Sequence, residues 1–480
     1  MTSSACHVGR GRLMAAASLS RVARGRSLGR AAAATCAVVL GGCLKTPARD
    51  AASALDVTVH PPASFELEGK PFCFGGSNNY YAIFKPRPVV DDLFLAAKAL
   101  DMRVMRVWGM LDRGSLDGKV ASADPDGGDK EGVYFQYWDP AKKAPAYNDG
   151  PQGLERLDYV LAKAAELDLK IIVVLVNNWR AFGGIDQYLI WYGRDKHHEF
   201  FTEPELKTAY KNWVSHVIGR TNSINGRKYK DDPTVFSWEL ANEPRMKGGN
   251  AFDRDTGWDK STLTDWAGEM SAYIKSLDAN HMVSVGDEGF LDGGGEHWAY
   301  EANDGVDNKA LTALPGIDFG TFHLYPEDWG ATLQWGEQWI LDHLRVAREV
   351  GKPTVLEEYG AKVSRANGKL GPIVKGWPER ELAYRRWNEL MLRRGGNGFL
   401  PWMLSGIDEG EGRPIYPDYD GYGFYQDDET GRLIGDYAKR FITAPACESQ
   451  PPGSGGPPSP FVRSKHAPES VAFGWVKPKG

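Results

Sequence analysis

The chain has 480 residues, of which 42% are hydrophobic and 25% are charged, an ordinary balance for a globular protein that buries a large core. Its formal net charge of −6 provides no basic field to attract a phosphate backbone, so the sequence argues against nucleic-acid binding. The five cysteines include no CxxC pair and no metal-ligand spacing with the histidines, which argues against a zinc site and against a dense disulfide framework.

The amino-terminal segment has the order of charge and apolarity that is typical of an export signal. Residues 1–30 are rich in Arg and contain no acids, and a short run of small apolar residues follows from Ala31 to Gly42. This run is too short to span a bilayer. It ends at Cys43 in a segment, Leu-Gly-Gly-Cys, that resembles the bacterial lipobox, whose cysteine is lipid-modified. We therefore predict a signal peptide with lipobox over residues 1–43, lipidation at Cys43, and a secreted or cell-surface, outer-membrane lipoprotein; a mitochondrial transit peptide is the alternative.

Two polar segments border the part of the chain that is predicted to fold. Residues 44–54 form a short, Ala-rich spacer, which we interpret as a tether. From residue 444 the chain is rich in Pro, Gly and Ser, a composition that cannot build a core, and we predict a disordered tail over residues 444–480. One folded domain is therefore predicted over residues 55–443. Cys73 and Cys447 lie near its two ends, and the sequence leaves open whether they form a disulfide.

Apolar runs rich in Val and Ile alternate with longer amphipathic stretches in this domain, a pattern typical of repeated βα units. Strands are predicted at Phe72–Ser77, Arg103–Trp108, Lys170–Val176, Val235–Leu240, Met282–Gly286, Ile317–Phe322, Thr354–Glu357 and Gly398–Trp402. Helices are predicted between them, at Val90–Leu100, Gly153–Leu167, Glu203–Thr221, Thr262–Leu277, Leu333–Val350 and Glu379–Arg394. Eight strands separated mainly by helices favour an α/β fold of the closed (β/α)8 TIM-barrel type over an open, doubly wound sheet.

Two long insertions interrupt this pattern. Leu111–Asp149 follows the second strand and Phe290–Leu314 follows the fifth, and both are rich in Gly, Asp and Tyr. In a barrel, the loops that follow strands lie on the face where active sites form. We therefore expect both insertions to border the site.

Glutamates stand at the ends of two predicted strands. The fourth strand runs into Asn242-Glu243-Pro244, and the seventh runs into Glu357-Glu358-Tyr359-Gly360. A single Glu at such a position is usually a solvated or capping group, but a pair of them is what glycosidic bond cleavage requires. The reaction needs a protonated acid beside the leaving oxygen and an ionised carboxylate across the sugar, roughly 5–5.5 Å apart when configuration is retained. We expect partial burial and a neighbouring anion to keep the acid protonated near neutral pH.

These two segments resemble glycoside hydrolase family 5, in which barrel strands four and seven carry the glutamates. Further segments match the family in the same order, namely Gly76–Tyr80, Arg106–Trp108, His323–Tyr325 and Trp402. Within the family, Asn177-Asn178-Trp179 and the segment Leu356–Gly360 are most similar to the endo-β-1,4-mannanase subgroup. The resemblance covers roughly residues 56–443, which is nearly all of the predicted domain.

The resemblance implies a role for each matching residue. Glu243 is expected as acid/base and Glu358 as nucleophile, whereas Glu239 and Glu357 are expected in the barrel interior. Substrate-binding roles are implied for Arg106, Trp108, Asn178, Trp179, Asn242, His323, Tyr325 and Trp402. Charge and hydrogen bonding from the arginine are expected to keep the nucleophile ionised, and the His and Tyr to contact the acid/base and the nucleophile. The structural alternatives are an ordinary salt bridge for the arginine, a buried structural histidine, a turn at Asn242 and core packing for Trp179.

The sequence thus predicts a retaining glycoside hydrolase that cleaves β-1,4-mannosidic bonds in mannan-type polysaccharides by double displacement. We expect it to need no cofactor and no metal, to be a monomer, and to contact a membrane only through its anchor. Two enzyme alternatives stay open: a retaining β-glycosidase for another glycan such as cellulose or glucomannan, and an exo-acting mannosidase. From a different class, a surface glycan-binding lipoprotein that has lost catalysis would use the same aromatic cleft.

Overall fold

The computed structural model describes residues 63–124, 129–248, 257–363, 379–408, 415–444 and 459–466. The chain divides into two units, Met1–Val57 and Thr58–Gly480, and only the second contains described residues. The predicted signal peptide, the lipobox at Cys43 and the tether therefore lie outside the described residues. The account that follows concerns the second unit.

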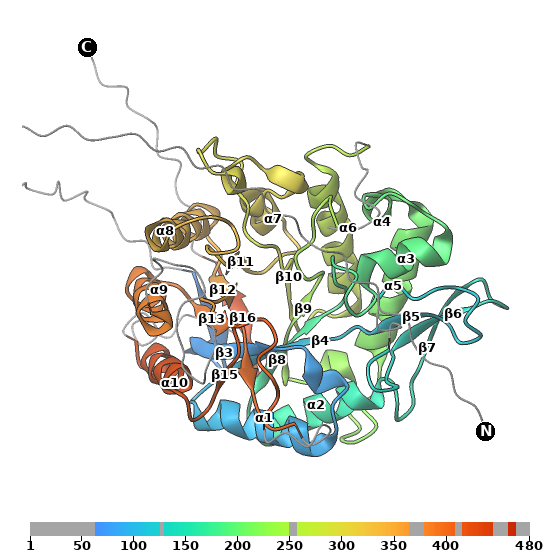
Figure 1. Cartoon of the computed structure of the whole chain (residues 1–480), viewed down its shortest axis with the longest axis horizontal. Coiled ribbons are helices and arrows are strands. Elements are labelled where there is room, and N and C mark those ends of the chain that lie inside the picture. Colours follow the sequence, from blue (N-terminus) through green and yellow to red (C-terminus); the bar gives the residue numbers. More distant parts are fainter. Residues whose placement is uncertain are drawn as a thin grey trace, which may run out of the picture. The chain divides into compact units, whose positions relative to one another are not determined.

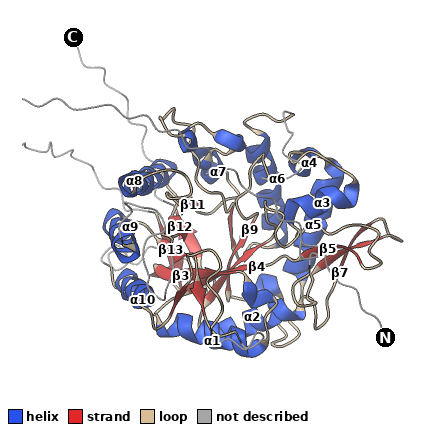
Figure 2. Cartoon of the chain, in the orientation of Figure 1, coloured by secondary structure: helices blue, strands red, loops and turns tan. Residues whose placement is uncertain are grey.

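A parallel sheet forms the centre of this unit (Figures 1 and 2). Its strands are β3 (Phe74–Asn79), β4 (Val104–Trp108), β8 (Lys170–Val174), β9 (Val235–Glu239), β10 (Met282–Ser284), β11 (Gly320–Leu324), β12 (Thr354–Tyr359) and β13 (Gly398–Pro401). Their hydrogen-bonded order is β10-β9-β8-β4-β3-β13-β12-β11, and every neighbouring pair is parallel.

The two end strands of that order, β10 and β11, follow each other in the chain and bring the sheet round to closure. The N–H of Asp318 donates to the carbonyl of Val283 at 2.9 Å, and the N–H of His323 donates to the carbonyl of Glu288 at 3.0 Å. The predicted (β/α)8 barrel is therefore confirmed. Each of the eight predicted strands is present, with its ends shifted by up to three residues.

Helices surround the sheet (Figure 2). The six predicted helices correspond to α1 (Arg87–Ala99), α2 (Glu155–Glu166), α5 (Pro204–Gly219), α6 (Thr262–Leu277), α8 (Leu333–Val350) and α9 (Arg380–Arg394). The structure adds α3 (Gly184–Tyr192), α4 (Glu199–Thr202), α7 (Asn308–Ala313) and α10 (Glu429–Ile442). Among the described residues, no helix is both long and apolar enough to cross a lipid bilayer.

Local signals fix where the helices begin and end. At the start of α8 the Thr332 side chain accepts the N–H of Trp335 at 3.1 Å, and the helix stops at Gly351 in the left-handed region, with φ 76°. Between these ends, α8 buries a stripe of side chains that includes Trp339 and Leu344 against the barrel. By contrast α3 is buried nearly all round, so it lacks the amphipathic pattern that would predict a surface helix.

The insertions fold as separate small elements. Leu111–Asp149 contains a three-stranded sheet of β5 (Asp112–Ser115), β6 (Gln136–Asp139) and β7 (Ala144–Tyr147), which lies at the side of the barrel in Figure 1. Phe290–Leu314 contains the short helices η3 (Trp298–Tyr300) and η4 (Asn303–Gly305) before α7. A further pair, β14 (Leu404–Ser405) and β15 (Phe424–Tyr425), follows the last barrel strand.

A second small sheet covers the amino-terminal end of the barrel. β1 (Ser64–Leu67) pairs with β2 (Lys70–Pro71) and also, antiparallel, with β16 (Arg463–Lys465) from the carboxyl-terminal segment. Val462 and Phe65 are buried in one cluster with aromatic side chains from the barrel interior. The predicted disordered tail over residues 444–480 is therefore wrong for this strand. Burying side chains of this size is worth about 1.5–3 kcal/mol each, which explains why a segment behind a Pro/Gly-rich stretch is ordered.

Cys73, at the start of the first barrel strand, is disulfide-bonded. The other four cysteines, Cys447 among them, lie outside the described residues.

Candidate active site

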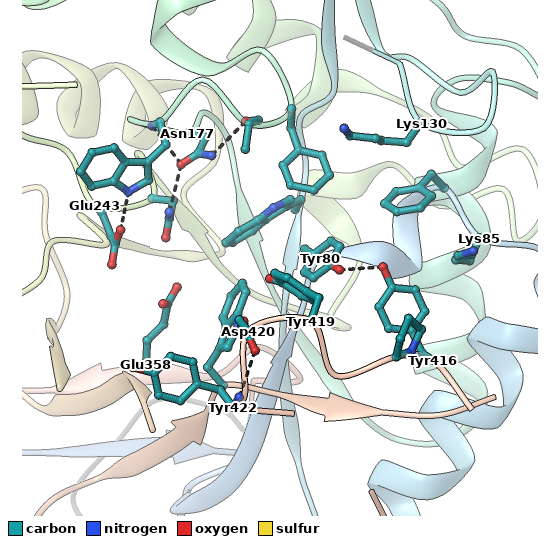
Figure 3. A pocket seen from close by; sticks show the side chains of 18 of the residues that line it. Tyr80, Lys85, Lys130, Asn177, Glu243, Glu358, Tyr416, Tyr419, Asp420 and Tyr422 are labelled. Carbon is teal, nitrogen blue, oxygen red and sulfur yellow. Dashed lines mark hydrogen bonds between the residues drawn. The ribbon is translucent and has the colours of Figure 1, made fainter. Parts of the chain in front are cut away.

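A cleft of about 950 Å³ lies at the carboxyl ends of the barrel strands. Its walls come from the ends of β4 and β12 and from the segments that follow β3, β8, β9, β10, β11 and β13, and the first insertion contributes residues 129–132. Aromatic rings provide much of the wall, with Glu243 and Glu358 between them. Figure 3 shows these two carboxylates facing each other at one end of the cleft, with Tyr80, Tyr416 and Lys85 toward the other. The volume and the mixture of apolar walls with few polar groups are typical of a ligand site.

Glu243 stands where the chain leaves β9, and its backbone is in the left-handed region with φ 51°. The conformation is held because its N–H donates to the carbonyl of Gly286 at 2.8 Å. A non-glycine residue with such a φ is uncommon, and such positions concentrate at functional sites. Here the turn directs the Glu243 side chain into the cleft instead of along the strand.

Glu358 belongs to β12, whose pairing with both neighbouring strands shifts register next to it. Adjacent residues of a regular strand face opposite sides, yet Glu357 and Glu358 are both buried and both lie near Arg106. The register shift allows this, because a β-bulge re-aims one side chain. One oxygen of Glu243, one oxygen of Glu358 and one ring nitrogen of His323 all lie within 4.8 Å of one another.

Arg106 and Tyr325 hold Glu358. The guanidinium Nη1 of Arg106 donates to Oε1 of Glu358, and the hydroxyl of Tyr325 donates to Oε2 at 3.0 Å. Burial raises the pKa of Glu358, and the charges of His323 and Arg106 oppose that shift. Arg106 is completely buried and does not line the cleft. The contact agrees with the expected role of Arg106 in holding the nucleophile by charge and hydrogen bonding, whereas direct contact with substrate is wrong because the side chain is fully buried.

His323 and Trp179 hold Glu243. Nδ1 of His323 lies 2.9 Å from Oε1 of Glu243, and the indole N–H of Trp179 donates to Oε2. Burial alone would raise the pKa of Glu243, but the hydrogen bond and charge of His323, the charge of Arg245 and the Trp179 bond lower it to about 2. Despite burial, the surrounding carboxylates raise the pKa of His323. Burial was expected to raise the pKa of Glu243, but in the free site the neighbouring cations and the Trp179 hydrogen bond lower it instead.

The remaining predicted residues divide into two groups. Trp108, Trp179, Asn242, Tyr325 and Trp402 line the cleft, whereas His323 lies buried behind Glu243.

The structure contradicts the prediction that Asn178 binds substrate. It is fully buried, and its amide joins His197 Nε2 at 2.9 Å, the N–H of Arg245 at 3.0 Å and the carbonyl of Lys247 at 3.1 Å. It therefore fixes the loop after β9 and does not bind substrate. The neighbouring Asn177 lines the cleft instead, where its Oδ1 accepts from Asn242 at 3.0 Å. Sequence reasoning missed this because both residues follow the strand end, where strict alternation has stopped.

Asn242 is held from two sides. Its Oδ1 accepts from Nη2 of Arg106 at 2.8 Å, and its Nδ2 donates to Asn177. Because Arg106 can only donate, the amide orientation of Asn242 is fixed. Arg106 thus fixes the positions of Glu358 and Asn242 together.

The wall after β13 consists of tyrosines and an aspartate that sequence reasoning did not single out. Trp402 stacks with Tyr80 at a centroid distance of 6.0 Å, and its indole N–H donates to Asp420 at 2.9 Å. The hydroxyls of Tyr80 and Tyr416 are hydrogen-bonded at 2.6 Å, a contact drawn as a dashed line in Figure 3. The density of Tyr and Asp in residues 416–422, in the loop region that follows the last barrel strand, is the signal that could have indicated this wall.

A buried ion pair on the opposite side was also missed. Arg245 donates from Nε and Nη2 to the two oxygens of Glu288, and its guanidinium lies 5.1 Å from the Trp179 ring centroid. Burial raises the pKa of Glu288 to about 7, although Arg245 opposes the shift. Arg245 directly follows the Asn-Glu-Pro segment, so its position in the sequence was the available signal.

Comparison with known proteins agrees with this geometry. The family model for "GH family 5 beta-mannosidase-like" proteins matches residues 63–376. A probable mannan endo-1,4-beta-mannosidase C of Aspergillus terreus is 35% identical over 383 residues, which cover 78% of this chain and 89% of that protein. The crystal structure of the endo-1,4-beta-mannanase from Rhizomucor miehei matches with a TM-score of 0.70 and 34% identity over 80% of this chain and 98% of that one.

The X-ray structure of the endo-beta-1,4-mannanase from Thermotoga petrophila is also similar, with 40% identity and a TM-score of 0.64 over 78% of this chain and 77% of that one. A matching family model over most of the chain, a similar barrel and two glutamates in the expected places thus agree. The chain belongs to glycoside hydrolase family 5, within its β-mannosidase-like group.

Proposed function

We propose that this protein is a retaining endo-β-1,4-mannosidase that cleaves mannan-type polysaccharides by double displacement. The observation that carries the mechanism is the facing pair Glu243 and Glu358, with one oxygen of each within 4.8 Å of the other. Retaining glycosidases hold their carboxyl groups roughly 5–5.5 Å apart, whereas inverting enzymes leave roughly 6.5–9.5 Å for a water molecule. The names of the similar proteins support mannan as the substrate class.

In the first step, Glu358 attacks the anomeric carbon as the bond to the leaving oxygen breaks. Arg106 and Tyr325 orient its carboxylate, and their hydrogen bonds favour the ionised form that acts as nucleophile. The leaving oxygen takes a proton from Glu243, and the sugar becomes an ester of Glu358. The proton reaches Glu243 from Nδ1 of His323, 2.9 Å away. Trp179 holds the other Glu243 oxygen during this transfer.

In the second step, water attacks the anomeric carbon of the ester and gives its proton to Glu243. The bond to Glu358 breaks, the sugar leaves with its original configuration, and the carboxylate is restored. Glu243 and His323 together hold one proton at the start and at the end of the cycle. The step therefore balances without a metal or a cofactor.

The decisive experiment offers linear mannan, cellulose and xylan to the full chain, with Glu269→Gln, a partly exposed carboxylate that pairs with two lysines on the helix layer, as control. We expect cleavage of mannan with the β-anomer formed first, and at least a thousandfold loss in Glu243→Gln and Glu358→Gln. With an aryl β-mannoside whose leaving group departs without protonation, azide should restore product in the alanine variants, as the β-glycosyl azide with Glu243→Ala and the α-glycosyl azide with Glu358→Ala. Cleavage of another glycan alone would refute the substrate, and an α-anomer as first product would refute retention.

We also propose that the protein is exported and anchored through a lipid on Cys43. The order of Arg-rich segment, short apolar run and cysteine supports this. Expression in a bacterial host and fractionation test it: Cys43→Ser should move the protein from the membrane fraction to the soluble fraction. An unchanged distribution would exclude the anchor.

A further inference from the structure

Below the two cleft carboxylates lies a second carboxylate pair, which the proposed mechanism does not use. Glu239 in β9 and Glu357 in β12 are both completely buried in the barrel interior. Their carboxyl groups are within hydrogen-bonding reach of each other. A Cβ on Gly286 would lie 2.3 Å from Oε1 of Glu239, so the backbone closes tightly around this carboxyl group.

The cations around this pair are distributed unequally. Arg106 donates to Glu239 from Nε at 3.0 Å and from Nη2 at 2.6 Å. Glu357 has only longer contacts, 3.9 Å from Nε of Arg106 and 3.7 Å from Nε2 of His323. Within the described part of the chain, neither oxygen of Glu357 meets a conventional hydrogen-bond donor. An ionised carboxylate that is buried without a donor is strongly disfavoured.

One proton between Glu239 and Glu357 removes this difficulty. Two ionised carboxylates cannot hydrogen-bond to each other, but a protonated one donates its O–H to an ionised one. All five N–H hydrogens of Arg106 are already engaged by Glu239, Glu358, Asn78 and Asn242, so no further donor is available from that side.

The charges around the pair also favour one proton shared between Glu239 and Glu357. The titratable groups that face the pair are Arg106 from β4, His323 from β11, Glu358 from β12, Glu243 after β9, Asp287 after β10 and Tyr210 from α5. Arg106 and His323 are the two cations, and four glutamates surround them. Full ionisation of these acids would leave a net negative charge in a buried site, which burial opposes. Burial and the charge of Glu357 accordingly raise the pKa of Glu239.

We propose that Glu239 and Glu357 hold one proton between them, and that the single negative charge left on the pair keeps His323 protonated and thus able to supply Glu243. Nε2 of His323 faces Glu357 at 3.7 Å while Nδ1 faces Glu243 at 2.9 Å, so the imidazole connects the two carboxylate pairs. Glu239 and Glu357 are positioning residues, since neither lines the cleft. The consequence for catalysis rests on the proposed function, but the proton count of the pair does not.

Glutamine variants of the full chain separate the possibilities, because an amide has the charge of a protonated carboxyl. With one shared proton, Glu239→Gln and Glu357→Gln each leave one negative charge, so the alkaline limb of the pH–activity profile should move by less than about half a unit. The double variant removes the charge, and His323 should then lose its proton at lower pH, moving this limb down by about one unit or more. A full-unit shift in either single variant would mean that both carboxylates are ionised and would overturn the proposal. An unmoved limb in the double variant would overturn it as well.

Nitrogen-15 NMR of histidine-labelled protein provides a readout that does not depend on catalysis. The His323 signal, assigned by its loss in His323→Gln, should report a charged imidazole at pH 7 in the wild type and in both single variants. A neutral imidazole in the wild type or in either single variant would contradict the proposal, even if the double variant fails to fold. If no glycan is cleaved, the proposed function fails, while the pH midpoint of the His323 signal in the wild type and the single variants still tests the proton count: a shift of a full unit in either single variant would overturn it.

Asp158→Asn is the matched control. Asp158 is a buried carboxylate on α2 that bonds to Arg220 and Tyr229 away from the cleft. Its loss should lower the melting temperature without moving either limb of the profile or the His323 signal. If Asp158→Asn moved the alkaline limb by a similar amount, the limb would be responding to lower protein stability in general, and the assignment to Glu239 and Glu357 would be overturned.

Discussion

The hydroxyl of Tyr325 donates a hydrogen bond of 3.0 Å to the Glu358 oxygen that Arg106 leaves free. Tyr325 and Arg106 reach this carboxylate from segments far apart in the sequence, from a loop after β11 and from β4. They bind different oxygens, so the carboxylate plane is fixed. This is the arrangement that a nucleophile with a single direction of attack requires.

Tyr325→Phe tests that arrangement. Loss of one hydrogen bond to a charged group is worth about 1.5 kcal/mol, so kcat/KM on mannan should fall roughly tenfold. The pKa of Glu358 should rise further because the ionised form loses a donor, and the acid limb of the pH profile should therefore move to higher pH. Tyr192→Phe, whose ring packs on Trp138 away from the cleft, is the control. An acid limb that stays in place would contradict the role of this bond.

Trp402→Ala should weaken glycan binding more than it slows the bond cleavage. The ring lies in the cleft, stacked on Tyr80 and fixed by Asp420, as a platform for the apolar face of a sugar. Aromatic contacts of this kind contribute roughly 0.5–1.5 kcal/mol beyond burial. Calorimetry of manno-oligosaccharide binding to the Glu358→Gln background should show at least a tenfold loss, which Trp402→Phe recovers in part. Equal affinity in the alanine variant would exclude the platform.

Glu288→Gln should change how stability depends on pH. Burial raises the pKa of Glu288 from 4.5 to about 7, so the folded protein holds a proton that the unfolded chain releases between these values. The contribution of the Glu288 proton to the free energy of unfolding is complete below pH 4.5 and is lost as the pH rises through 7. The wild type should therefore lose roughly 3 kcal/mol of unfolding free energy relative to the variant across that range.

Denaturant unfolding at pH 4.5, 5.5 and 7 measures this difference. Glu269→Gln is the control, because lysines on the helix layer lower the pKa of Glu269 and the sign of its pH dependence is opposite. If the free energies of unfolding of the wild type and Glu288→Gln differ by the same amount at all three pH values, Glu288 is ionised over that whole range.

Val462→Ala should destabilise the barrel without affecting catalysis. Val462 is buried against Phe65 at the end opposite the cleft. Removing two methyl groups there should cost about 2 kcal/mol, including the cavity that remains. Arg463→Ala, at the exposed neighbouring position, should have little effect. If both variants have the same free energy of unfolding as the wild type, the β16 strand does not contribute to stability.

Local pattern was enough to predict the strands and the two glutamates at their ends. Runs of Val and Ile with intervening amphipathic stretches specify βα repeats, and the barrel rule then places the carboxyl ends of all strands on one face. Glu243 and Glu358 could be placed together for that reason, although 115 positions separate them in the sequence. The choice of Glu243 and Glu358 over the neighbouring Glu239 and Glu357 came from the resemblance to glycoside hydrolase family 5. The same resemblance indicated Trp108, Trp402 and Tyr325 as cleft residues.

Other features depend on contacts that no local pattern encodes. Asn177 lines the cleft in place of the predicted Asn178 because the chain has left its strand there. Strand β16 returns to β1 across more than 390 residues to bury Val462. The pKa of Glu243 likewise depends on contacts that only the folded chain makes. Its pKa is the sum of burial and of charges brought in by His323 and Arg245 from other parts of the chain, and only the folded structure sets those distances. The sequence determined which groups are present at the barrel mouth, whereas the tertiary structure decided how strongly their charges shift the pKa of each.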